Sequence, residues 1–112
     1  MTASTSLPMS RLGKRDREII HECLVAAAYG PFFPDWEFPI LFGLTREQAR
    51  SFADQWPESA EDAHAYRAVL NSLNNLAGYP IDHIDRWGDY LSSDRRELVA
   101  LAQRLHLLEQ PI

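Results

Sequence analysis

The sequence predicts an all-α protein, a small bundle of about four main helices with a long aromatic and proline-rich loop between the first two. Apolar residues recur at helical spacing in four stretches. No stretch alternates apolar and polar residues for long enough to form a convincing strand. The length of 112 residues and the apolar fraction of 46% suit one domain with one core. We therefore expect a disordered tail over residues 1–10 and a single helical domain over residues 11–112.

The first helix is predicted from about Gly13 to Tyr29, because apolar residues recur there at helical spacing. These residues are Ile19, Ile20, Cys23, Leu24, Ala27 and Ala28. Gly30 and Pro31 end the helix, since glycine is common at a helix C-terminus and proline cannot continue one. Cys23 is the only cysteine of the chain. We interpret it as a buried, unreactive thiol rather than a nucleophile.

The loop over residues 30–44 is unusually apolar. Its three prolines prevent one continuous helix, although Asp35 could cap a single turn from Trp36 to Phe42. A loop this long and aromatic must either pack onto the body of the protein or form a surface for a partner. In the first interpretation it covers the core. In the second, aromatic residues anchor an interface or a pocket, and these are Phe32, Phe33, Trp36 and Phe38.

The three later helices are each predicted from a pair of polar residues three positions apart, which is typical of a helix N-terminus. These pairs are Thr45 with Gln48, Ser59 with Asp62, and Asp94 with Glu97. The second helix runs to Trp56, where Pro57 stops it, and the third ends at Gly78. A short segment separates the third helix from the last.

The third helix carries an unusual polar face, away from its Leu70 and Leu73 stripe. Its members are His64, Arg67, Asn71, Asn74 and Asn75. Three asparagines inside a helix cost about 2 kcal/mol relative to alanine. Their carboxamides could form hydrogen bonds with the backbone of the loop that the prolines interrupt. Alternatively, they could bind a ligand or a partner. A third possibility is that they are simply exposed to solvent. Both leading interpretations bring this face and the aromatic loop together.

The net charge of −5 is unevenly distributed. Arg11, Lys14, Arg15 and Arg17 form a basic cluster, whereas residues 18–112 hold 7 basic and 15 acidic side chains. Such a body repels phosphate backbones, so nucleic-acid binding is disfavoured and a protein partner with a basic surface is favoured. The first dozen residues lack the apolar segment of a signal peptide, and no run reaches the roughly 18 apolar residues of a membrane span. We therefore expect a cytoplasmic protein that does not associate with membranes.

Chemical motifs are scarce. Glu18 with His21 and Glu61 with His64 have the Glu-x-x-His spacing of half a di-iron site. However, His64 points away from the apolar face of its helix, and His21 lies only at the edge of its own, whereas metal ligands in a bundle must project inward. His83 belongs to an acidic turn that lacks a third metal ligand at a predictable spacing. The motifs of nucleotide binding and of the common hydrolases are absent. The sequence therefore predicts no cofactor, no metal ion and no catalytic residue.

Two segments carry a family resemblance. Residues 31–38 and 41–43 read PFFPDWEF and LFG, and residues 71–80 read NSLNNLAGYP. They resemble segments of small uncharacterised bacterial proteins. The resemblance covers about a third of the chain and implies that the loop and the asparagine helix belong together. It implies no activity.

The leading functional hypothesis is a protein-binding module, specifically an immunity- or antitoxin-like inhibitor that covers a partner protein. The alternative is a small-ligand-binding domain or a small enzyme, with His64 as a possible acid–base group. Its pocket would be lined by Trp36, Phe38, Arg67, Asn71 and Asn75. A third hypothesis is a homodimer that uses the aromatic loop as its interface.

Overall fold

The computed structural model describes residues 7, 9–79 and 81–109, and over these residues the chain is helical without strands. The α-helices are α1 (Lys14–Tyr29), α2 (Phe38–Phe42), α3 (Arg46–Asp54), α4 (Ala65–Gly78), α5 (Trp87–Tyr90) and α6 (Arg95–Glu109). Short 3₁₀ helices are η1 (Met9–Arg11), η2 (Glu58–Glu61) and η3 (Ile84–Arg86). The predicted all-α class is confirmed.

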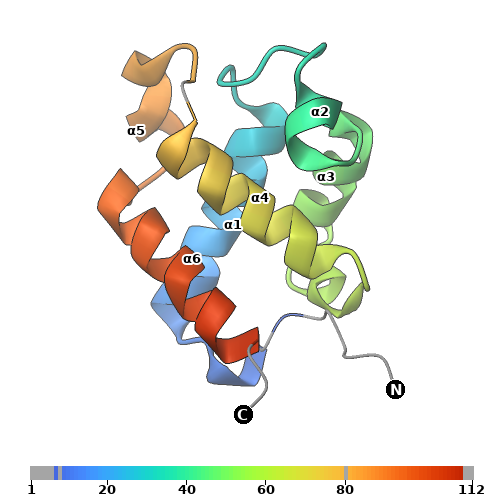
Figure 1. Cartoon of the computed structure of the whole chain (residues 1–112), viewed down its shortest axis with the longest axis vertical. Helices are drawn as coiled ribbons and strands as arrows, with labels where there is room; N and C mark the ends of the chain where they lie inside the picture. Colours follow the sequence, from blue (N-terminus) through green and yellow to red (C-terminus); the bar gives the residue numbers. More distant parts are fainter. Residues whose placement is uncertain (1–6, 8, 80, 110–112) are drawn as a thin grey trace.

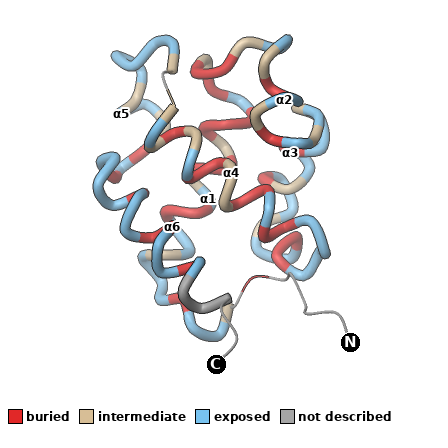
Figure 2. Tube along the Cα trace, viewed as in Figure 1, coloured by how far each residue is buried: buried red, intermediate tan, exposed pale blue. Residues whose placement is uncertain are grey.

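Helix α1 lies at the centre of the fold, against α3 and α4, and α4 in turn packs against α6 (Figure 1). The short α2 sits on α4, and α5 sits on α1. Buried positions follow the inward faces of these helices, while their outward faces are exposed (Figure 2). The largest fully buried aliphatic side chains are Ile20, Val69, Leu73, Leu76, Leu98, Leu101 and Leu105.

Two of the predicted helix starts are confirmed by their hydrogen bonds. The Gln48 amide donates to Thr45 Oγ1 (3.1 Å), and the Thr45 amide donates to Gln48 Oε1 (2.9 Å). Asp94 and Glu97 form the same reciprocal pair before α6. These boxes satisfy amides that the first turn of a helix leaves without partners.

The predicted start of the third helix is wrong. Residues Glu58–Glu61 form η2, and α4 begins only at Ala65. The Ser59 hydroxyl donates to the Phe52 carbonyl oxygen (2.7 Å) instead of capping a helix, and Asp62 accepts from the His64 amide (2.8 Å). The second helix is also shorter than predicted, since α3 ends at Asp54.

The ordered part of the chain begins before residue 11. Most of the expected disordered tail lies outside the described residues, but Leu7 is buried and η1 starts at Met9. The Arg17 guanidinium donates to the Met9 carbonyl oxygen (2.5 Å). One arginine of the basic cluster therefore holds this segment against α1.

None of the helices in the described part of the chain is long and apolar enough to cross a membrane.

Candidate functional site

Three of the four aromatic residues singled out in the loop are core residues. Phe32, Phe33 and Phe38 are buried. Phe32 makes edge contacts with the rings of Trp87 and Tyr90, and Phe33 makes one with Phe42. Phe38 stacks on Phe42 with a centroid separation of 4.2 Å. These rings close one end of the core and leave little surface for a partner.

Trp36 behaves differently from the phenylalanines. Its side chain is 71% exposed, and Ile40, four residues later, is 75% exposed. Pro39 beside them is also exposed. Trp36, Pro39 and Ile40 are thus three exposed apolar residues at and just before the start of α2, and we call them the apolar turn. Its underside is the buried pair Phe38 and Phe42.

The asparagines of α4 hold the apolar turn from below. Asn71 Nδ2 donates to the Phe42 carbonyl oxygen (2.9 Å), and Asn75 Nδ2 donates to that of Leu41 (3.3 Å). The prediction that the asparagine face meets the loop backbone is therefore confirmed for these two residues. It is wrong for Asn74, which is exposed and lies by the shallow groove between α4 and α6.

Arg46 also fixes the loop, and the sequence analysis missed it. Only 16% of its side chain is exposed. The guanidinium lies 4.5 Å from the Phe38 ring centroid, and its Nε donates to Asp35 (2.8 Å). It also donates to three carbonyl oxygens, those of Ala27, Ala28 and Phe33. No spacing rule signals this role, because the acceptors are backbone atoms brought together by the fold.

Asp35 does not cap the helical turn as predicted. It accepts from Arg46, and α2 begins at Phe38 with Glu37 as the preceding residue. The carboxylate of Glu37 instead accepts from the Tyr79 hydroxyl (3.0 Å). The start of α2 is therefore set by tertiary contacts rather than by a local cap.

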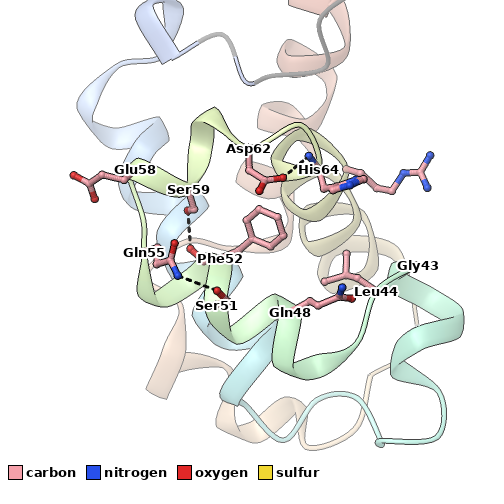
Figure 3. Close-up of a pocket in the computed structure, with 11 residues that line it drawn as sticks. Gly43, Leu44, Gln48, Ser51, Phe52, Gln55, Glu58, Ser59, Asp62 and His64 are labelled. Atoms are coloured by element: carbon pink, nitrogen blue, oxygen red, sulfur yellow. Dashed lines mark hydrogen bonds between the residues drawn. The ribbon is translucent and has the colours of Figure 1, made fainter.

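A cleft of about 560 Å³ opens beside the apolar turn, between α3, η2 and the first turn of α4 (Figure 3). Leu44 and Phe52 supply its apolar part. Its polar lining residues are Gln48, Ser51, Gln55, Glu58, Ser59, Asp62, His64 and Arg67. The volume lies within the range of roughly 300–1,000 Å³ that is usual for small-molecule sites.

The cleft only partly matches the pocket expected from the sequence. His64 and Arg67 border it, as expected. Of the other residues expected there, Phe38 is buried, Trp36 is on the outward face of the turn, and the two asparagines bond the backbone of α2. Most of the unpredicted residues come from α3 and η2, which the sequence predicted only as helical segments.

The acidity of the protein is concentrated around the apolar turn and the cleft. Residues 35–62 carry 7 carboxylates and 2 arginines, a balance of −5, while the rest of the chain has 9 acidic and 9 basic residues. Both arginines of this segment, Arg46 and Arg50, donate to carbonyl oxygens at the end of α1. Arg46 is half-buried, whereas Arg50 is exposed and lies over the Tyr29 ring. The outer surface of the segment therefore carries one arginine beside its carboxylates.

The titratable groups offer little support for catalysis. Burial raises the pKa of the Cys23 thiol far above its usual value, so the thiolate that could attack a substrate does not form. Hydrogen bonds to Asp54 and Glu37 raise the pKa of Tyr29 and Tyr79, respectively. Within residues 7, 9–79 and 81–109, no three His, Cys, Asp or Glu side chains are grouped as metal ligands.

No family model matches the chain, and neither the curated proteins nor the solved structures include a significant match.

Proposed function

We propose that this protein is a protein-binding module that covers a basic surface on a partner, in the manner of an immunity protein or an antitoxin. The apolar turn is the anchor of the interface, and it belongs to the same segment of the chain, residues 35–62, as the excess carboxylates. The proposal belongs to recognition rather than catalysis.

The observation that carries the proposal is the exposure of two large apolar side chains on one rigid turn. Trp36 and Ile40 are 71% and 75% exposed, although the rest of the loop's aromatic residues are buried. Asn71, Asn75 and Arg46 fix the backbone beneath them. A backbone that is already held in place loses little conformational freedom on binding, and tryptophan is enriched among the residues that dominate binding energy.

The charge distribution supports a partner with a basic contact surface. Opposite charges across an interface accelerate association and disfavour partners of the wrong sign. The balance of −5 in residues 35–62 lies in the same segment as the apolar turn. The Asp35 side chain, next to Trp36 in the sequence, is 93% exposed, so a partner that contacts Trp36 would also meet this carboxylate.

The test is affinity capture of the tagged protein from its native lysate, followed by mass spectrometry, with three forms compared in parallel. They are the natural chain, the double variant Trp36→Ala with Ile40→Ala, and Val99→Ala as the matched control. Val99 is 42% exposed on α6, away from the apolar turn. Thermal unfolding of each form verifies the fold.

We expect one basic protein in stoichiometric amount with the natural chain and with Val99→Ala, lost from the double variant and released by high salt. Equal retention by the double variant, an acidic contact surface on the partner, or an elution that holds only the bait would contradict the proposal. Sedimentation at two protein concentrations tests the alternative that the protein is a homodimer. In that case the natural chain would self-associate, and Trp36→Ala with Ile40→Ala would abolish the self-association.

A further inference from the structure

The cleft beside the apolar turn has features of a small-molecule site that the protein-binding role does not require. In Figure 3 the Phe52 ring projects into the space bounded by Asp62, His64 and Leu44. The carboxylate of Glu58 extends away from that ring. The cleft thus combines an apolar wall with charged groups around it.

Internal hydrogen bonds use some of the polar lining groups and leave others available. Ser59 donates to the Phe52 carbonyl oxygen, and Gln55 donates to the Ser51 hydroxyl. Gln48 uses its carbonyl oxygen to accept from Thr45, so its amide nitrogen remains available. These bonds hold the walls of the cleft in place.

The groups with unused bonding capacity carry both signs of charge. One carboxylate oxygen of Asp62 accepts from the His64 amide, and the other forms no hydrogen bond with a described residue. Within the described part of the chain, the Arg67 guanidinium and the His64 imidazole also form no hydrogen bond or ion pair. The Arg67 side chain lies alongside Gly43, so it has a fixed neighbour but no counter-ion.

We propose that this cleft binds a small zwitterion, namely an amino acid with an apolar side chain. The carboxylate of the ligand pairs with Arg67 and His64, its ammonium group pairs with Asp62, and its side chain packs on Phe52 and Leu44. A ligand with a single charge fits less well. A simple amine leaves Arg67 without a counter-ion, and a simple acid leaves Asp62 without one, so each forms one charged hydrogen bond fewer than the amino acid.

The test uses two sets of matched probes in calorimetric or NMR titrations. The aromatic set is L-phenylalanine, 3-phenylpropionate and 2-phenylethylamine, and the aliphatic set is L-leucine, 4-methylpentanoate and 3-methylbutylamine. Within a set the apolar part is nearly constant, while the ammonium or the carboxylate is removed. We expect the amino acid of at least one set to bind about 10-fold or more tightly than both of its analogues, because each loses one charged hydrogen bond.

Two variants identify the role of each charge. Arg67→Gln should reduce the affinity for the amino acid to that for the amine, and Asp62→Asn should reduce it to that for the simple acid. Asp62→Asn keeps an oxygen that can accept from the His64 amide, so the local fold is preserved. Arg96→Gln, an exposed arginine on α6, is the control and should leave every affinity unchanged.

The proposal is overturned if no probe of either set binds at millimolar concentration, if an analogue binds as tightly as its amino acid, or if Arg67→Gln leaves amino-acid binding intact. These results are independent of the partner capture, because neither Trp36 nor Ile40 lines the cleft.

Discussion

At the residue scale, Arg46 shows how one buried cation can hold a loop that contains three prolines. Its guanidinium donates to the carbonyl oxygens of Ala27, Ala28 and Phe33 and to the carboxylate of Asp35. Two of these acceptors belong to the end of α1, where a helix presents carbonyls without intrahelical partners. The positive charge also suits the negative end of the helix dipole.

Arg46→Met should lower the free energy of unfolding by about 2–4 kcal/mol, because methionine keeps part of the packing but leaves several carbonyl oxygens without a donor. Urea denaturation measures this change. Arg96→Met, on the exposed side of α6, is the control and should change stability by less than about 0.5 kcal/mol. If Arg46→Met lowers the free energy of unfolding no more than Arg96→Met does, water replaces the hydrogen bonds of the Arg46 guanidinium at no cost.

Asn71→Ala should lower the free energy of unfolding by about 1–3 kcal/mol, since the Phe42 carbonyl oxygen loses its donor in a half-buried position. Asn74→Ala is the matched control, because Asn74 is exposed and alanine has the higher helix propensity. Denaturant melts of both variants provide the comparison. If Asn71→Ala leaves the free energy of unfolding unchanged and weakens ligand binding instead, Asn71 contacts a ligand rather than stabilising α2.

Two phenols make stability sensitive to alkaline pH. Hydrogen bonds to carboxylates raise the pKa of Tyr29 and of Tyr79 above the ordinary value of 10.0, so the native state favours the protonated phenol. This stabilisation is fully present below pH 10 and is lost as the pH rises through the raised values. Tyr29→Phe with Tyr79→Phe should therefore flatten the fall in stability above pH 10, which unfolding melts at several pH values would detect. If the double variant loses stability with pH as steeply as the natural chain, the two phenols are not the cause of the loss.

At the element scale, the joint between α2 and α3 depends on a left-handed residue. Gly43 has φ 71° and directs the chain from α2 into the capping box of α3. Gly43→Ala should cost about 1–2 kcal/mol, the usual penalty for a side chain in this region. Gly78→Ala, at the last position of α4 and with open space around it, should instead be neutral or stabilising. Thermal melts of the two variants would compare their unfolding temperatures. If both substitutions change the unfolding temperature equally, the left-handed backbone at Gly43 does not disfavour a side chain.

How well each element could be predicted depends on the range of the interactions that define it. The capping boxes of α3 and α6 are local, because both partners lie within four residues, and the sequence located them. The pair of Ser59 and Asp62 has the same spacing, but Ser59 bonds to α3 across a turn. A spacing rule cannot distinguish these cases, because the competing acceptor belongs to another element.

The candidate site, like the helix starts, could be predicted only in part. The cost of placing asparagines inside a helix indicated that they had acceptors, and Asn71 and Asn75 do. Periodicity could not show which loop aromatics are exposed, because Pro31, Pro34 and Pro39 interrupt any regular pattern in this segment. The cleft was beyond reach from the sequence, since its walls come from α3, η2 and α4.

At the scale of the whole molecule, charge is divided between a balanced body and one acidic segment. Residues 35–62 account for the entire net charge of −5. Among their carboxylates, those of Glu47, Glu58 and Glu61 belong to exposed residues. Arg46 and Arg50 both donate to the Ala28 carbonyl oxygen at the end of α1, and Arg50 is also exposed. The segment that contains the apolar turn therefore differs from the rest of the chain in net charge.

An uneven charge distribution gives a protein an electric dipole, and here the segment that contains Trp36 is a source of negative potential. In the field of a basic partner the molecule would rotate during diffusion, so that its apolar turn arrives first. Glu47→Gln with Glu61→Gln should therefore slow association severalfold and change dissociation little, which rapid-mixing kinetics with the captured partner would measure. A change confined to dissociation would place these carboxylates within the bound contact. Orientation before contact would let a small acidic protein reach its target quickly even when both are scarce.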